Sequence, residues 1–104
     1  MTDVLTIAKN YIAYLGQVGI PVSSAYLYGS YAKGQQRDAS DIDICVVSPS
    51  FAGKNFFDEM VRLNQLGLKI DSRIETVPYT QEDLDDKYSS LANEIRNTGI
   101  QIGA

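Results

Sequence analysis

The sequence predicts an α+β domain in which a small mixed β-sheet is covered by helices, mainly on one of its faces. Apolar residues recur at helical spacing in three segments, near the start, in the middle and near the end of the chain. Segments rich in β-branched and aromatic residues lie between them, which is typical of strands. The chain has 104 residues, 44% hydrophobic and 21% charged, so we expect one core and a single domain over residues 1–104.

The first helix is predicted from Thr2 to about Val18, with Thr2 or Asp3 as its N-terminal cap. Two glycines and then Pro21 indicate where it ends. The segment Val22–Tyr28 carries β-branched and aromatic residues and predicts the first strand.

A short helical turn over residues 31–33 and a polar, glycine-bearing loop are expected next. This loop leads into a second strand, Asp41–Val47. Apolar residues at helical spacing then predict a helix over Asn55–Leu66, which Gly67 ends.

Residues 68–77 predict a third strand, and its alternation places four polar side chains on one face: Lys69, Asp71, Arg73 and Glu75. After Pro78, a capped helical turn over residues 80–86 and a last helix over Tyr88–Asn97 complete the chain. The element order is therefore helix, strand, strand, helix, strand, helix. We expect the polar face of the third strand to belong to a sheet face that is free for function.

The charge balance argues against duplex nucleic acid as a partner. The formal net charge is −4 and the sequence pI is about 4.6, so long-range attraction to a polyanion is absent. The only candidates for a local phosphate contact are Lys33 and Arg37 in one loop and Arg73 further on.

Several chemistries and locations are excluded by what the chain lacks. Without histidine, neither a Ser-His-Asp triad nor a histidine zinc site is possible. The single cysteine, Cys45, is expected to be a buried apolar residue and fits a reducing compartment. No secretory leader pattern and no run of about 18 apolar residues occurs, so we expect a cytoplasmic protein with no membrane contact.

Two aspartates stand one residue apart in the predicted second strand. Strand alternation sends Asp41 and Asp43 to the same side, with Cβ atoms roughly 6 to 7 Å apart, and sends Ile42 and Ile44 to the core. Two such anions repel each other unless a cation or hydrogen bonds offset the repulsion. Oxygen ligands of this kind suit Mg²⁺ or Mn²⁺, and Mg²⁺ is often held together with substrate phosphates.

A phosphate site is predicted beside these acids, at the end of the first strand. Gly29 lets the backbone approach a phosphate closely, and the Ser30 hydroxyl and nearby N–H groups can donate to its oxygens. If the two strands pair through the loop between them, this turn and the aspartates meet at one end of the sheet.

The pattern Gly29-Ser30, ten residues, then Asp41-x-Asp43 resembles the signature of the nucleotidyltransferase superfamily that includes DNA polymerase beta. The stretch Tyr28–Val47 is especially similar to its minimal members, which occur as antitoxins of all-helical HEPN ribonuclease toxins. Chance occurrence of these four residues at this spacing is on the order of one in a thousand for a chain of this size. The resemblance implies the polymerase beta-like nucleotidyltransferase fold.

Members of this superfamily use a third carboxylate from a neighbouring strand, and the predicted third strand offers Asp71 and Glu75. The spacing from Gly67 to Asp71 matches some minimal members. Glu75 lies nearer the end of the strand, where the family's acid usually stands, and Asp71 could instead pair with Arg73. Glu75 is slightly favoured and the choice stays open, since a Glu here departs from the usual Asp.

The resemblance implies that Asp41, Asp43 and the third acid hold Mg²⁺ or Mn²⁺ ions that bridge the triphosphate and the attacking oxygen. Ser30, the N–H groups near Gly29 and Lys33 would then hold the β- and γ-phosphates, although Lys33 is equally well explained as surface charge. The third acid would complete one metal shell and accept the proton of the nucleophile.

The implied function is transfer of a nucleoside monophosphate, AMP from ATP, to a hydroxyl on a partner protein such as a HEPN toxin, with the chain as antitoxin. Two alternatives remain: a binding module that neutralises its partner by contact alone, and transfer to a small molecule or an RNA end. The seven tyrosines are either interface anchors or residues at the edge of the core, and a homo-oligomer also stays open.

Overall fold

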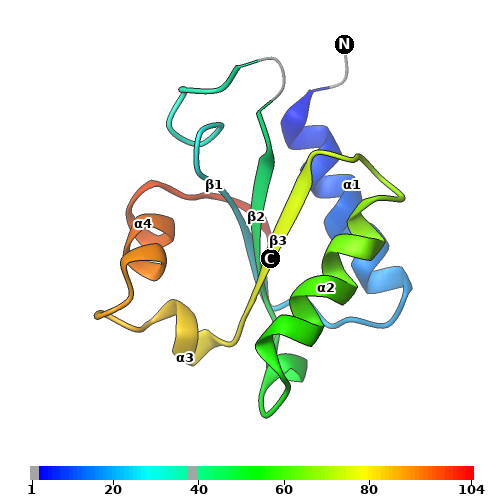
Figure 1. Cartoon of the computed structure of the whole chain (residues 1–104), viewed down its shortest axis with the longest axis vertical. Coiled ribbons are helices and arrows are strands. Elements are labelled where there is room, and N and C mark those ends of the chain that lie inside the picture. Colours follow the sequence, from blue (N-terminus) through cyan, green and yellow to red (C-terminus); the bar gives the residue numbers. More distant parts are fainter. Residues whose placement is uncertain (1–2, 38–39) are drawn as a thin grey trace.

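The computed structural model describes residues 3–37 and 40–104, and within them it forms a four-stranded mixed sheet with helices on both faces (Figure 1). The strand order is β3-β2-β1-β4; β1 runs antiparallel to β2 and β4, and β2 runs parallel to β3. The predicted α+β class with a small mixed sheet is confirmed. The element bounds are α1 Val4–Gln17, β1 Ser24–Tyr28, β2 Ile42–Val47, a 3₁₀ turn Pro49–Phe51, α2 Phe56–Gly67, β3 Ile74–Tyr79, α3 Gln81–Leu84, α4 Ser90–Thr98 and β4 Ile100–Gly103.

The predicted helices are confirmed to within a few residues, and side-chain caps explain where they begin. Asp3 accepts from the N–H of Leu5, and Asn55 accepts from the N–H of Asp58. Thr80 opens α3 with a capping box. Thr2, the predicted start of α1, lies outside the described residues, as do residues 38 and 39 of the predicted loop.

The third strand begins later than predicted. Residues 68–73 are not strand, because the N–H groups of Ile70 and Asp71 both turn back to the carbonyl of Gly67, at 2.9 and 3.0 Å. The strand then runs through Pro78, which an edge strand tolerates because one side of it makes no ladder. Asp71 and Arg73 therefore precede β3 and do not share a strand face with Glu75.

The fourth strand was not predicted. β4 is four residues long, and Ile102 is its only buried residue, so its sequence shows no clear period. It forms because β1 offers a free edge, along which it pairs with a register shift between Ala25 and Tyr26. In the turn after β1, the expected short helix over residues 31–33 is instead a set of hydrogen-bonded turns.

Two cores lie on opposite faces of the sheet, so the prediction that helices cover mainly one face is wrong. α1 and α2 enclose the larger core on one side, and α3 and α4 enclose a smaller core on the other (Figure 1). β2 serves both cores, because Ile42, Ile44 and Val46 point to the larger core while Cys45 and Val47 point to the smaller one. Cys45 is a free and fully buried thiol, as predicted.

The free edge of β3 is held by α2 and α1 through Thr76. The Thr76 N–H donates to Asn64 Oδ1 at 2.8 Å, and Asn64 Nδ2 donates to the Thr76 carbonyl at 3.3 Å. The buried Tyr11 hydroxyl lies 2.7 Å from Thr76 Oγ1 and 3.1 Å from the Leu63 carbonyl. Burial raises the pKa of Tyr11 to about 12, so this hydroxyl stays protonated and its network stays neutral.

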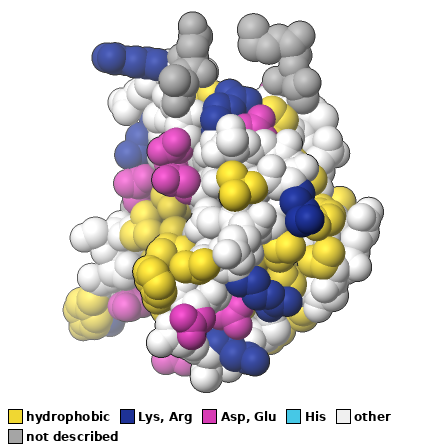
Figure 2. Space-filling view, turned by 45° about the vertical axis from the view of Figure 1, so that its right-hand side comes forward, with side chains coloured by type: hydrophobic (Ala, Val, Ile, Leu, Met, Phe, Trp, Pro, Cys, Tyr) yellow, Lys and Arg dark blue, Asp and Glu magenta, His cyan; other side chains and the backbone are white. Residues whose placement is uncertain are grey.

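The side of the molecule that carries α2 exposes apolar side chains among charged ones (Figure 2). The large exposed apolar residues in and after this helix are Phe56, Phe57, Val61 and Leu68. No helix in the part of the chain that the structure describes is long and apolar enough to cross a membrane.

Candidate functional site

The turn after β1, which contains Gly29, packs directly against Asp43. Gly29 has φ +74°, and a Cβ built on it would lie only 2.3 Å from Asp43 Oδ2. Glycine is strongly favoured here, because a larger residue would adopt a strained backbone and its Cβ would push the Asp43 carboxylate aside. The Lys33 N–H donates to the Gly29 carbonyl at 3.2 Å and the Gln35 N–H to the Ser30 carbonyl at 2.8 Å, so the turn is fixed in this contact.

Strand register places three polar side chains in one row across the sheet. Tyr28 of β1 pairs with Asp43 of β2, and Asp43 pairs with Glu75 of β3. Asp43 and Tyr28 are half-buried and Glu75 is exposed, so the row lies at the open end of the face that α3 and α4 cover elsewhere. Burial and the charge of Asp43 raise the pKa of the Tyr28 phenol, which therefore stays neutral.

Asp43 is the most perturbed acid of the site. Burial is the main cause that raises its pKa to about 6, followed by the charges of Glu75, Asp41 and Glu94 and a hydrogen bond with Glu75. Asp43 and Glu75, paired across β2 and β3, are thus close enough for the charge of Glu75 to act on Asp43. An acid pair of this kind favours binding of a cation, which offsets the repulsion.

Asp41 lies one residue before β2 and is exposed, so the strand begins one residue later than predicted. Its charge acts on Asp43, as expected for two acids directed to one side. Ile42 and Ile44 are fully buried in the larger core, which confirms the predicted alternation.

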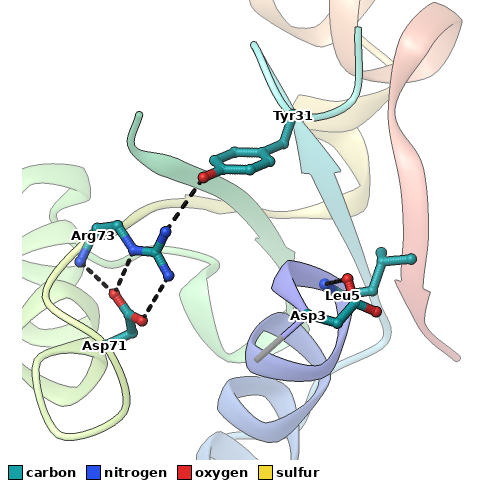
Figure 3. Close-up of polar contacts among 5 residues, drawn as sticks. All are labelled: Asp3, Leu5, Tyr31, Asp71 and Arg73. Carbon is teal, nitrogen blue, oxygen red and sulfur yellow. Dashed lines mark hydrogen bonds and ion pairs between the residues drawn. The ribbon is translucent and has the colours of Figure 1, made fainter. Parts of the chain in front are cut away.

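Asp71 binds Arg73 and is not part of the row formed by Tyr28, Asp43 and Glu75 (Figure 3). Its Oδ1 accepts from the backbone N–H and Nε of Arg73 at 2.9 and 3.1 Å, and its Oδ2 accepts from the guanidinium at 3.0 Å. These hydrogen bonds lower the pKa of Asp71. Arg73 also donates to the Tyr31 hydroxyl at 3.3 Å, so this pair ties the turn before β3 to the loop after β1. Of the two candidate third acids, only Glu75 lies in register with Asp43.

The loop cation Lys33 makes an ion pair that the sequence did not indicate. Lys33 Nζ lies 3.4 Å from Glu94 Oε1 of α4, and both side chains are about one third exposed. Glu94 also contributes to the raised pKa of Asp43, so it is a fourth acid near the row. Nothing in the sequence around Glu94 distinguishes it from other helical surface acids. Arg37 is exposed.

The donor set consists of carboxylate oxygens, which are the ligands that Mg²⁺ and Mn²⁺ prefer. The pairing of the Asp43 and Glu75 carboxylates across the sheet and the close approach of the glycine turn to Asp43 fit a divalent cation placed beside a phosphate. Within residues 3–37 and 40–104, no three side chains of His, Cys, Asp or Glu are grouped closely enough to form a complete metal shell. Asp41, Asp43 and Glu75 are the residues available to such an ion.

Comparison with solved structures supports this fold. A "putative nucleotidyltransferase" from Sulfolobus solfataricus matches with a TM-score of 0.70 over 94% of this chain and 78% of its own, at 22% identity. A chain from a toxin–antitoxin structure with AMP-PNP matches with a TM-score of 0.66 over 92% of this chain and 73% of its own, at 30% identity. A structure of a tri-AMPylated Shewanella oneidensis HEPN toxin in complex with its MNT antitoxin matches with a TM-score of 0.58 over 96% of this chain and 73% of the other, at 26% identity.

A search of curated protein sequences gave no match. The model of the nucleotidyltransferase domain family matches residues 9–97, which include the glycine turn, the aspartate pair and Glu75. With the sheet topology and the structural neighbours in agreement, the chain belongs to the nucleotidyltransferase domain family.

Proposed function

We propose that the chain transfers AMP from ATP to a hydroxyl group of a partner protein, with the help of Mg²⁺ or Mn²⁺. The observation that carries this proposal is the contact of the Gly29 turn with Asp43, which stands in register with Glu75. A phosphate-binding turn and an acid pair then meet at one point, as phosphoryl transfer requires.

Each residue has a defined task in this reaction. Asp41, Asp43 and Glu75 would hold the divalent cation, which would neutralise negative charge on the triphosphate. Ser30, the N–H groups of the turn and Lys33 would bind the β- and γ-phosphates. The acceptor oxygen attacks the α-phosphorus. The bond between the α-phosphorus and the oxygen that bridges to the β-phosphate breaks, and pyrophosphate leaves. Glu75, the most exposed acid of the row, accepts the proton of the acceptor hydroxyl.

The nucleotide and the partner are suggested by the structural neighbours. One neighbouring structure contains AMP-PNP, and another contains an AMPylated HEPN toxin with its MNT antitoxin. We therefore infer that the acceptor is a helical HEPN-type toxin and that modification silences it, with this chain as the antitoxin. A cytoplasmic setting agrees with the supply of ATP and with the free thiol of Cys45.

The test is to incubate the protein with Mg²⁺, α-labelled ATP and the product of the neighbouring gene. We expect label on the partner with the wild type and none with Asp43→Asn. Asp58→Asn serves as the matched control, because it removes the same charge from an exposed position on α2. No label with the wild type, or equal label with Asp43→Asn, would contradict the proposal.

A second candidate function is neutralisation of the partner by contact alone. It is favoured by the absence of a complete three-acid metal shell among the described residues. Under this alternative, Asp43→Asn protects cells from the partner as well as the wild type does, and calorimetry detects no Mg²⁺-dependent binding of ATP. Under the transfer reaction, the same substitution abolishes both.

A further inference from the structure

Lys33 and Glu94 join the loop after β1 to α4 beside the site. Their ion pair measures 3.4 Å between Nζ and Oε1. α4 is anchored on the sheet by Ala92 and Ile95, which are almost completely buried, so the backbone that carries Glu94 is fixed. Lys33 follows the Gly29 turn by four residues and reaches Glu94 with a long side chain.

The pair lies where the phosphates of a nucleotide are expected. The Lys33 N–H donates a hydrogen bond to the Gly29 carbonyl, and Gly29 packs against Asp43. Glu94 is close enough to Asp43 for its charge to act there. Lys33 is thus a cation close to the acids of the site, and Glu94 binds it.

An ion pair that is one third exposed contributes little to stability, so breaking it costs little. A triphosphate carries several negative charges and offers Lys33 a stronger partner than one carboxylate. The side chain of Lys33 has the rotatable bonds that are needed to move from one to the other.

We propose that Glu94 holds Lys33 in the nucleotide-free protein and competes with the phosphates of the nucleotide for it, so that Glu94 sets the affinity of the site for ATP. This inference rests on the proposed function, since it assumes a triphosphate at the Gly29 turn. Glu94 acts through Lys33 and is not assigned to the metal.

Two other roles for Glu94 lead to different results. If Glu94 bound the metal, its removal would weaken the binding of Mg²⁺ and of Mg²⁺-ATP. If Glu94 only repelled phosphate as one more surface charge, its removal would strengthen binding of ATP by the same factor whether Lys33 is present or not.

The experiment measures the dissociation constant of ATP by calorimetry with saturating Mg²⁺, for four proteins: wild type, Glu94→Gln, Lys33→Gln and the double variant. We expect Glu94→Gln to bind ATP about two- to fivefold more tightly than the wild type, the range that an exposed ion pair allows. Lys33→Gln should bind more weakly, and adding Glu94→Gln to it should give a smaller gain in affinity than Glu94→Gln gives in the wild type. Asp58→Asn on α2 should bind as the wild type does.

Weaker binding by Glu94→Gln, or an equal gain in the presence and absence of Lys33, would overturn the inference. Thermal unfolding of each variant checks that α4 and the loop remain folded. The two proposals fail separately: if the wild type binds no ATP, both are refuted, whereas ATP binding that depends on Asp43 but not on the Lys33–Glu94 pair refutes only this one.

Discussion

Gly29 is the residue at which backbone conformation and chemistry coincide. Its φ of +74° favours glycine, and a Cβ built on it would lie only 2.3 Å from Asp43 Oδ2. We expect Gly29→Ala to lower the free energy of unfolding by about 1–3 kcal/mol from backbone strain. It should also abolish Mg²⁺-dependent binding of ATP, because the new methyl group displaces the carboxylate. Urea denaturation and calorimetry measure the two effects.

Gly53 provides a matched control for that substitution. Its φ is +73°, and a Cβ on it would meet nothing within 4 Å. Gly53→Ala should therefore show the strain without the clash, and ATP binding should be unchanged. Equal loss of ATP binding in both variants would show that the contact with Asp43 is irrelevant.

Sequence spacing was sufficient to predict the aspartate pair and its alternation with Ile42 and Ile44, because a strand has a fixed period of two. It was not sufficient to choose between Asp71 and Glu75. Their placement depends on where β3 begins. The hydrogen bonds to the Gly67 carbonyl leave Asp71 in the turn before the strand, whereas Glu75 lies in register with Asp43. Glu94 gave no signal, because its position beside Lys33 depends on the packing of α4.

At the level of elements, the position of Glu75 depends on how β3 is held at its free edge. Asn64 binds both backbone groups of Thr76, the residue next to Glu75. We expect Asn64→Ala to lower the free energy of unfolding by roughly 1–3 kcal/mol, since it leaves partly buried polar groups of an edge strand without a partner. ATP affinity with Mg²⁺ should also fall, as Glu75 is no longer fixed.

Gln65→Ala is the matched control for Asn64→Ala. Gln65 is exposed on the same helix, and the change to alanine has a similar effect on helix propensity. Urea denaturation and ATP calorimetry should show little change. If Asn64→Ala destabilises the protein but leaves the ATP affinity intact, then Asn64 holds the strand without positioning Glu75.

The elements with clear periods were predictable, and those that depend on a neighbour were not. α1, α2 and α4 bury regular apolar stripes and follow from their sequences. β4 exists because β1 has a free edge to pair with, and its four residues contain no periodic signal of their own. The late start of β3 likewise depends on contacts outside the strand. These are the hydrogen bonds to the Gly67 carbonyl and the Asp71–Arg73 pair.

At the level of the whole molecule, two layers of helices cover the sheet except where Asp43 and Glu75 lie. One face of β2 is buried in the larger core along the whole strand. On the other face, Cys45 and Val47 are buried, but Asp43 is only half-buried. The sequence predicted one covered face because the short helix α3 and the nine-residue α4 bury few side chains. The partial cover on this second face leaves Asp43 half-buried, which strengthens its repulsion by the neighbouring acids.

This repulsion lowers the stability of the metal-free protein. At pH 7 the charges on Asp43, Glu75, Asp41 and Glu94 oppose one another. Asp43→Asn should therefore raise the urea midpoint of the metal-free protein above that of the wild type. Mn²⁺ should stabilise the wild type by about 2.7 kcal/mol at a concentration of 100 times its dissociation constant, and should leave Asp43→Asn unchanged. Asp58→Asn on α2 should respond to Mn²⁺ as the wild type does. If Mn²⁺ stabilises all three proteins equally, or if Asp43→Asn is less stable than the wild type without metal, these acids do not form a cation site.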